Sequence, residues 1–363
     1  MTLSCFHLHH VRNLFSTRLS FHPLFNLFIG KNAQGKTSLL EAIYLLALGR
    51  SFRATKSDMV IAYPHASLAC YGEVQGQNRL SLGIEKHRQG ETLYKINGER
   101  CERLSDYAYV LPVQVITPDT FKLLLEGPEG RRRFLDWGVF HVEHSFGADC
   151  QRYLRLLKQR NALLKQSANR QLLSSWEKTF VEVGERISQS REHYLRETLT
   201  FINEDCQALL PGLTLCVEYE RGWEQNQPFI DALSASYAQD RRLGYTCRGP
   251  HRAEIAIKLG GEPVSQSLSR GQQKLLICAL HLAQGRHLAA RMGKRCLYLL
   301  DDIGSELDKE NRQRLLALLA ARGHQVFLTG VDEAPWQEVC ETFGGRMFHV
   351  EHGKITLKDF VTP

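Results

Sequence analysis

The chain has 363 residues, of which 43% are hydrophobic and 23% charged, and its net charge is +7. This composition suits a globular protein of one large or two modest domains and excludes a disordered, low-complexity or repeat protein. No apolar run reaches the roughly 18 residues of a membrane-spanning helix, and residues 1–11 do not resemble a signal peptide.

The ten cysteines contain no Cys-x-x-Cys pair, which disfavours a zinc site. Most of them lie in apolar stretches, where cysteine behaves as a small core residue. We therefore expect free thiols and a cytoplasmic protein.

The first 120 residues are predicted to be mostly strand with one strong helix. Residues 18–28 form an apolar, strand-rich approach to a glycine loop, and residues 36–48 carry apolar side chains at helical spacing. Further strands are expected at 66–73, 79–86, 92–96 and 110–116.

The character of the chain changes at Gly127-Pro128. Residues 129–210 contain no proline and are rich in helix formers, with apolar faces that predict two or three helices. We expect a helical lobe, residues 128–212, inserted between the two parts of a head domain, residues 1–127 and 213–363.

The last part of the chain is again of mixed α/β type. Helices are expected at 274–290 and 308–322, strands at 296–300 and 325–328, and a hairpin that joins 346–350 to 354–357. Strands that alternate with helices predict a sheet with parallel strands and helices on its faces.

Residues 30–37 fit the phosphate-loop pattern G-x-x-x-x-G-K-[ST], with a strand before them and a helix after them. Backbone N–H groups and the helix N-terminus would bind a nucleotide phosphate, Lys36 would reach the β- and γ-phosphates, and Thr37 would ligate Mg²⁺. The predicted ATP-binding residues of this loop are Gly30, Lys31, Asn32, Ala33, Gln34, Gly35, Lys36 and Thr37.

Two acids end the apolar strand at 296–300. A buried strand places its C-terminal acid beside the phosphate loop, where ligands of α/β proteins bind. Asp301 would hold Mg²⁺, and Asp302 would orient or deprotonate the attacking water. Asp302 and Lys36 are thus the predicted catalytic residues.

Residues 267–273 read Ser-Leu-Ser-Arg-Gly-Gln-Gln and stand about thirty residues before Asp301. They are similar to the signature of ABC-type ATPases, in which L-S-x-G-Q opens a helix. The resemblance implies that Ser269, Gly271 and Gln272 complete the nucleotide site of a second subunit, so that ATP is sandwiched between two heads.

Several short sequence motifs, here called phrases, narrow the resemblance to one family of ABC-type ATPases. They are Gly-Lys-Asn-Ala-Gln-Gly-Lys-Thr at 30–37, Leu-Gly-Arg-Ser-Phe-Arg at 48–53, Ile-Thr-Pro-Asp at 116–119, Gly-Pro-x-x-x-Arg-Arg-Phe-Leu-Asp-Trp at 127–137 and Gly-Pro-His-Arg at 249–252. With the signature, these phrases resemble the RecF family of ABC-type ATPases. The implied fold is an α/β ABC-type ATPase head with a mixed sheet and an inserted, mainly helical lobe.

The resemblance implies a recombination mediator that dimerises on ATP and binds duplex DNA near single-stranded gaps. It implies work with RecO and RecR to load RecA in gap repair and the SOS response. The alternative reading is an SMC-like structural clamp on chromosomal DNA, although the lobe is too short for the long coiled coils of that class.

Three positions depart from the usual pattern. Asp302 stands where many ABC ATPases have Glu, and Thr329 where many have a switch histidine. Both departures predict slow hydrolysis, and hence a weak ATPase that works as a timer. Ala33 replaces a frequent glycine, which is tolerable if its φ is negative.

Other positions fit two interpretations each. Gln114 fits the Q-loop glutamine or a strand glutamine with satisfied hydrogen bonds, and Arg12 fits a base or ribose contact or a turn. Arg50 and Arg53 fit phosphate, nucleotide or DNA contacts or a surface role. His251-Arg252 fits the nucleotide side of the head or a structural role.

Residues 130–170 contain nine Arg or Lys against three acids, so most of the net positive charge lies there. Such a segment fits a DNA-backbone surface or a solvated helical face. No motif for reading bases is present, so we expect contacts with phosphates alone. The predicted DNA contacts are Arg131, Arg132, Arg133, Arg152, Arg155 and Lys158.

Overall fold

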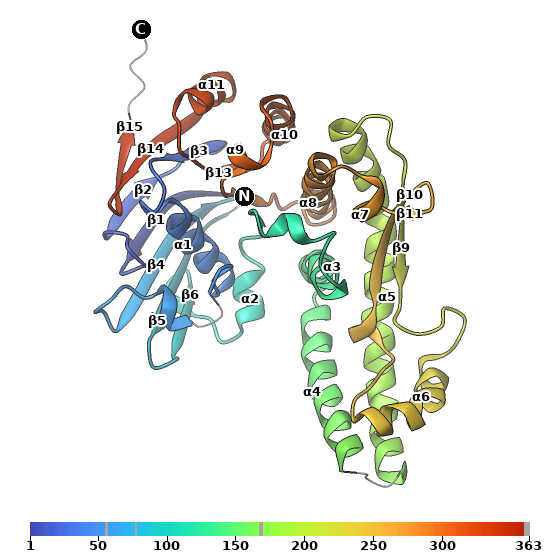
Figure 1. The fold of residues 1–363 in the computed structure, drawn as a ribbon. Helices are drawn as coiled ribbons and strands as arrows, with labels where there is room; N and C mark the ends of the chain where they lie inside the picture. Colours follow the sequence, from blue (N-terminus) through green and yellow to red (C-terminus); the bar gives the residue numbers. More distant parts are fainter. Residues whose placement is uncertain (55–56, 77, 167–169, 359–363) are drawn as a thin grey trace. The chain divides into compact units, whose positions relative to one another are not determined.

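The computed structural model describes residues 1–54, 57–76, 78–166 and 170–358. The chain folds into two compact units (Figure 1). The first unit combines Met1–Phe121 with Leu288–Pro363, and the second comprises Lys122–His287.

A mixed six-stranded sheet forms the centre of the first unit, in the order β15-β14-β3-β13-β12-β8. Its strands are β3 (Phe25–Ile29), β8 (Val113–Ile116), β12 (Leu297–Leu300), β13 (Gln325–Gly330), β14 (Gly345–Glu351) and β15 (Lys354–Lys358). β14, β3, β13, β12 and β8 are parallel, and β15 pairs with β14 as a hairpin. Every residue of β3, β12 and β13 is buried, as expected of parallel strands covered on both faces.

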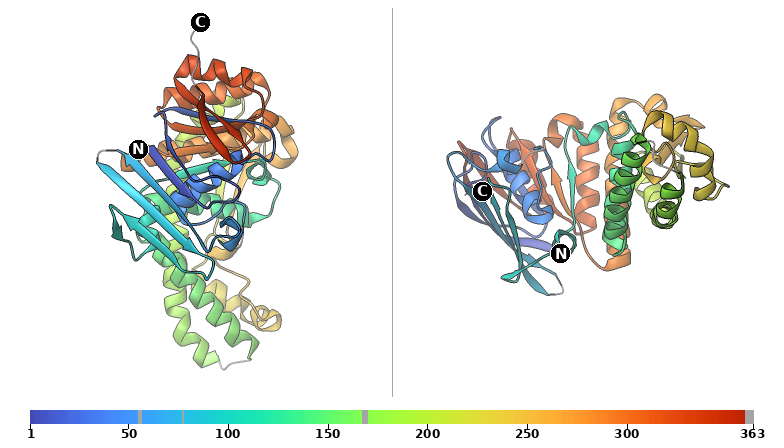
Figure 2. Two further views of the ribbon diagram at one scale, coloured as in Figure 1. Left: turned by 90° about the vertical axis from the view of Figure 1, so that its left-hand side faces the viewer. Right: turned by 90° about the horizontal axis from the view of Figure 1, so that it is seen from below.

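The second sheet of this unit is antiparallel, with its strands side by side in the left view of Figure 2. In the order β2-β1-β4-β5-β6-β7, its strands are β2 (Thr17–Ser20), β1 (Thr2–His9), β4 (Ser67–Gln75), β5 (Arg79–His87), β6 (Thr92–Ile96) and β7 (Glu99–Arg100). Helix α1 (Lys36–Leu48) packs against β4, β5 and β13, so it lies between the two sheets.

Short helices complete the first unit. They are η1 (Ser57–Val60), α2 (Leu104–Ala108), η2 (Thr120–Lys122), α9 (Ile303–Glu306), α10 (Lys309–Ala321) and α11 (Ala334–Phe343). η2 ends one residue beyond the boundary between the units. Asp308 begins α10 by accepting a hydrogen bond from the Asn311 N–H, as an N-cap residue does.

The second unit is built around long helices. They are α3 (Pro128–Val142), α4 (Phe146–Lys165), α5 (Arg170–Leu209) and α6 (Phe229–Leu243), and α4 and α5 pack side by side (Figure 1). A small antiparallel sheet in the order β11-β10-β9 joins them, with β9 (Leu215–Glu220), β10 (Glu254–Leu259) and β11 (Glu262–Pro263). The turns η3 (Pro250–Arg252) and α7 (Val264–Ser267) flank β10, and α8 (Arg270–Met292) runs from this unit into the first.

The observed units differ in one respect from the expected division at residue 213. Residues 213–287 group with the helices of 128–212, because β9 packs against α5 and β10 against α3. The predicted head, residues 1–127 and 213–363, groups the segments that carry the nucleotide-binding motifs, and this division stays a prediction.

Candidate functional site

The glycine loop, residues 30–37, links β3 to α1 at the carboxyl end of the parallel strands. Gly35 lies at the N-cap of α1 with φ +115°, a conformation that glycine adopts readily. At Gly30, an added Cβ would lie 2.2 Å from the carbonyl oxygen of Val350, so only glycine fits. Both glycines of the motif are therefore required by the fold of the loop.

Ala33 has a φ of +64°, so the negative φ that would make alanine tolerable is not what the structure has. The path of the loop requires a left-handed backbone conformation at position 33, even though alanine does not favour that conformation. A left-handed conformation costs a non-glycine residue about 1–2 kcal/mol. Alanine thus occupies a glycine position at some cost in stability.

The loop is also held by two segments far away in the sequence. The Gly353 N–H donates to the Gln34 carbonyl at 3.0 Å, and the His352 N–H donates to Gln34 Oε1 at 2.5 Å. From another side, Asn13 Oδ1 accepts a hydrogen bond at 3.1 Å from Oγ of Ser38, the residue of α1 that follows the loop. The β14–β15 hairpin thus supports the loop, a role that the sequence pattern does not reveal.

Lys36 is buried under the loop. Its Nζ donates to the carbonyl oxygens of Gly30 at 2.6 Å and Lys31 at 2.8 Å. Burial lowers the pKa of Lys36, and the charges of Asp302 and Asp301 oppose that effect. Lys31, Asn32 and Ala33 are exposed at the rim of the loop.

The two acids after β12 lie beside the loop, as expected from the strand order. Asp301 Oδ1 accepts hydrogen bonds from Thr37 Oγ1 at 3.0 Å and from Thr329 Oγ1 at 2.8 Å. Burial raises the pKa of Asp301, whereas the two threonine hydroxyls and the charge of Arg53 lower it. Thr37 and Asp301 therefore form one cluster of hard oxygen atoms.

Thr329 also determines the position of Asp302. Its hydroxyl accepts the Asp302 N–H at 2.9 Å while it donates to Asp301. Asp302 is exposed, has a φ of +52°, and accepts a hydrogen bond from Ser305 Oγ at 2.8 Å. Threonine at this position is a hydrogen-bonded link between the two acids, a role that sequence reasoning missed.

Arg12 is engaged within the protein. Its guanidinium makes a bidentate ion pair with the buried Glu41 of α1, at 2.9 and 2.8 Å. Ser51 also donates to Glu41, and Ser51 Oγ accepts the Arg53 N–H at 2.9 Å. This network favours a structural role for Arg12 and positions the segment that carries the exposed Arg53.

Gln114 is buried within β8, opposite Tyr298 of β12 and two residues before the carboxyl end of the strand. This placement favours the strand-glutamine interpretation over a residue at the nucleotide site. Arg50 is exposed. In the second unit, His251 is hydrogen-bonded to Tyr153 Oη at 2.8 Å, and burial lowers the pKa of His251 to about 4.

The signature lies in the second unit and starts α8. Ser269 and Gln272 form a reciprocal cap: the Ser269 N–H donates to Gln272 Oε1 at 2.9 Å, and the Gln272 N–H donates to Ser269 Oγ at 3.3 Å. Ser269 is exposed, and no described atom lies within 4 Å of a Cβ built on Gly271. The start of this helix is thus accessible to a bound group.

The predicted DNA contacts separate into two groups. Arg131 is paired with Glu254 through two bonds of 2.7 Å, and Arg132 donates to the carbonyl of Ala253 at 2.9 Å. The remaining four residues are exposed; they are Arg133 on α3 and Arg152, Arg155 and Lys158 on α4. The exposed group is the better candidate for a DNA surface.

All ten cysteines are free thiols, as expected. Among the described residues, no helix is long and apolar enough to cross a membrane.

Comparisons with known proteins agree with this architecture. The model of the RecF/RecN/SMC N terminal domain matches residues 2–356. The chain is 43% identical over 357 residues to the DNA replication and repair protein RecF of Vibrio parahaemolyticus serotype O3:K6, covering 98% of this chain and 99% of that protein. It is 42% identical over 356 residues to RecF of Histophilus somni strain 129Pt, with 98% and 99% covered.

Among solved structures, the chain resembles the recombination mediator protein RecF-ATPrS in the RecFOR pathway. The TM-score is 0.90 and the identity 25%, with 98% of each chain covered. The structure of RecF-ATP in the same pathway gives a TM-score of 0.89 at 25% identity, with 99% of this chain and 98% of that chain covered. An Smc head bound to the C-winged helix domain of ScpA shares only the fold, with a TM-score of 0.56 at 15% identity and coverage of 99% and 98%.

Proposed function

The chain belongs to the RecF family of DNA replication and repair proteins, and from this premise we propose that it is a cytoplasmic, ATP-dependent switch that acts on DNA. One observation carries the proposal: Thr37 and Asp301, 264 residues apart in sequence, meet at 3.0 Å beside the glycine loop. Relatives in the same family have been solved with ATP and with ATPrS.

The glycine loop would bind the phosphates of ATP. The Gly30 N–H is bonded to the Gly330 carbonyl, so the loop residues after it and the N-terminus of α1 would supply the donors for an anion. Lys36 would exchange the carbonyls of Gly30 and Lys31 for the β- and γ-phosphates, since its ammonium already lies at the centre of the loop.

Mg²⁺ fits the residues beside the loop. Thr37 Oγ1 and Asp301 Oδ1 are hard oxygen donors, and Mg²⁺ in nucleotide sites takes one or two protein ligands together with phosphates and water. The described residues contain no cluster of three or more potential metal ligands, so the nucleotide would complete the shell. When bound, the ion supplies charge that stabilises the transferring phosphoryl group.

Asp302 would orient the attacking water. Its carboxylate is exposed and fixed by Ser305, while its backbone is held by Thr329. A threonine hydroxyl does not act as a base near neutral pH. Together with the short side chain of Asp302, this favours slow hydrolysis and a weak ATPase that times the bound state.

ATP would join two copies of the chain. Ser269, Gly271 and Gln272 present the exposed N-terminus of α8, which would bind the γ-phosphate held by the loop of the other copy. ATP then favours the dimer because it makes contacts there that a single copy lacks. The dimer would bind duplex DNA near gaps and, with RecO and RecR, help to load RecA.

Sedimentation with and without ATP tests the dimer. We expect the unmodified chain to dimerise with ATP, Lys36→Met to lose ATP binding, and Ser269→Arg to bind ATP as a monomer. Ser267→Arg is the matched control, because Ser267 is exposed two residues upstream and its hydroxyl bonds only to the Pro263 carbonyl among described contacts. Dimerisation of Ser269→Arg with ATP would overturn the arrangement in which one copy completes the site of the other.

The same experiment on duplex, gapped and single-stranded DNA separates the two candidate roles. A mediator should prefer gapped duplex, and its ATP-bound form should bind RecR or RecO. A clamp of the SMC type should bind continuous duplex equally well and need neither partner.

A further inference from the structure

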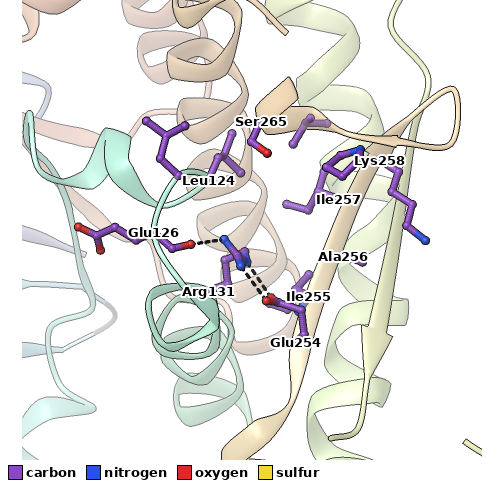
Figure 3. A pocket seen from close by; sticks show the side chains of 12 residues that line it. Leu124, Glu126, Arg131, Glu254, Ile255, Ala256, Ile257, Lys258 and Ser265 are labelled. Atoms are coloured by element: carbon purple, nitrogen blue, oxygen red, sulfur yellow. Dashed lines mark hydrogen bonds and ion pairs between the residues drawn. The ribbon is translucent and has the colours of Figure 1, made fainter. Parts of the chain in front are cut away.

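A pocket of 310 Å³ lies within the second unit, and its lining includes none of the residues assigned to ATP or DNA except Arg131. Residues 254–258 of β10 form one wall, residues 124–126 the opposite wall, and residues 263–265 one end (Figure 3). Because five consecutive strand residues line it, the pocket follows the edge of β10 and not one face of the sheet.

This edge of β10 is only partly paired. β9 pairs with β10 along its whole length on the other side, and β11 reaches only Lys258 and Leu259. Over residues 254–257, no strand of the described chain pairs with the edge that faces the pocket. Unpaired strand edges readily accept another strand.

A hydrogen bond to the Glu254 side chain reveals which backbone groups of β10 face the pocket. The Ile255 N–H donates to Glu254 Oε1 at 2.7 Å, so Ile255 directs its N–H away from β9. Alternation along a strand then directs the N–H and C=O of Ile257 the same way. The Glu254 side chain thus satisfies the outward N–H of Ile255. The outward N–H and C=O of Ile257 lie further along the strand, between Ile255 and the residues paired with β11.

The lining of the pocket carries little uncompensated charge. Arg131 is neutralised by its bidentate pair with Glu254, and Lys258 pairs with Glu218 at 3.0 Å. Glu126, which also lines the pocket, is the one charged lining residue whose side chain has no ion pair among the described residues, and its negative charge disfavours phosphates. Leu124 and Val264 supply buried apolar surface, and Leu125 is 63% exposed beside them. The surroundings therefore suit neutral, apolar side chains and not the phosphates of a nucleic acid.

We propose that this pocket binds an extended, uncharged apolar segment of a partner protein, which adds to β10 as a strand. The segment exchanges two backbone hydrogen bonds with Ile257 and places its flanking side chains against Leu124 and Val264. This mode of recognition obtains affinity from backbone bonds and specificity from side-chain pockets. The proposal is independent of ATP binding, so it can fail while the proposed switch stands.

The test measures binding of a fluorescent peptide, acetyl-Ser-Val-Ile-Val-Ser-amide, to the full chain by anisotropy. The matched probe is the same peptide N-methylated at its central isoleucine. The methyl group keeps all side chains but removes the peptide N–H that would donate to the carbonyl oxygen of Ile257. We expect the N-methyl peptide to bind about tenfold more weakly, the effect of losing one hydrogen bond. Equal binding of the two peptides rejects strand addition.

A protein variant locates the binding at the pocket. Leu125→Lys places a charge on the rim and should weaken peptide binding about tenfold. Leu154→Lys is the matched control, because Leu154 is 59% exposed on α4 and does not line the pocket. It should leave peptide binding and the melting temperature close to those of the unmodified chain.

Three other outcomes overturn the assignment. The first is an absence of peptide binding up to about 1 mM, which is the weak limit for specific recognition. The second is displacement of the peptide by a short oligothymidylate, and the third is equal loss of binding in both leucine variants. If the chain without peptide dimerises through a contact that Leu125→Lys alone abolishes, the occupant is a second copy and not a partner segment.

Discussion

Thr329 connects the two acids of the candidate site through a single hydroxyl. It donates to Asp301 and accepts from the backbone of Asp302, so both acids depend on the same oxygen atom. Asp302 also has a left-handed backbone, which needs support from its surroundings. One hydroxyl thus opposes the effect of burial on the pKa of Asp301 and also holds the backbone of Asp302.

Thr329→Val should disturb both functions. Valine keeps the volume but removes the hydrogen bond to the Asp302 N–H, which costs about 0.5–1.5 kcal/mol of stability in urea denaturation. The pKa of Asp301, already raised by burial, should rise further without this donor. Since the ionised carboxylate is the form that binds Mg²⁺, Mg²⁺-dependent ATP binding should weaken as pH falls, and should do so at higher pH in Thr329→Val.

Thr329→Ser is the control, because it retains the hydroxyl. Its pH profile for ATP binding should match that of the unmodified chain. Identical profiles for Thr329→Val and the unmodified chain would show that Thr329 does not control Asp301.

Ala33→Gly should stabilise the protein. Glycine removes the left-handed strain of about 1–2 kcal/mol, and the greater freedom of the unfolded chain offsets about 0.4–1 kcal/mol of that gain. We expect a net gain of up to about 1.6 kcal/mol in the free energy of unfolding. Ala33→Val should lose stability, because a β-branched side chain tolerates the left-handed conformation poorly. If both variants unfold at the same urea concentration, the left-handed backbone at position 33 does not cost stability.

The sequence predicted which residue types gather beside the glycine loop, but it did not predict most of the contacts that hold them. The pattern around Lys36 and the acids after residue 300 could be read directly, because chemistry fixes their spacing and order. The ion pair of Arg12 with Glu41 and the bonds from residues 352 and 353 to Gln34 could not, since they join segments with no shared pattern.

Helix α4 is the element whose surface can be tested most directly. Arg152, Arg155 and Lys158 follow one another at intervals of three residues and are exposed, so they lie along one stripe of the helix. Arg160 differs, because it is buried in an ion pair with Asp240 at 2.8 Å. The basic residues of α4 therefore have two roles: some form an exposed surface, and Arg160 is part of the core.

Reversing the stripe should weaken DNA binding. With Arg152→Glu, Arg155→Glu and Lys158→Glu together, the slope of log affinity against log salt should fall by about 3, close to one unit for each lost phosphate contact. Arg241→Glu with Arg242→Glu, exposed on α6, is the control and should change the slope little. Unchanged binding of the α4 variant to duplex DNA would place the DNA surface elsewhere.

Elements with strong periodicity were predicted closely. Residues 36–48 match α1, and residues 92–96 match β6. The first strand, β1, was not identified as an element, although residues 1–11 alternate apolar and polar side chains. The packing of β9 and β10 with the helices also escaped prediction, because pairing across 34 or more residues leaves no local signal.

At the scale of the whole molecule, each compact unit follows a different path through the sequence. The second unit is continuous, whereas the first is assembled from both ends of the chain. The central strand β3 lies between β13 and β14, about three hundred residues downstream. The glycine loop therefore depends on strands from both halves of the sequence.

This arrangement has a consequence for synthesis on the ribosome. Residues 25–29 emerge early but have no neighbours in their sheet until residues 325–351 have left the exit tunnel. Translation at about 5–20 residues per second makes that wait tens of seconds, during which an apolar strand stays open to wrong partners. In ribosome-stalled chains ending near residue 320, protease should spare residues 122–287 but cut residues 25–48; a nascent chain equally resistant in both regions would contradict this. The newborn protein would then need a chaperone for its earliest segment, not its latest.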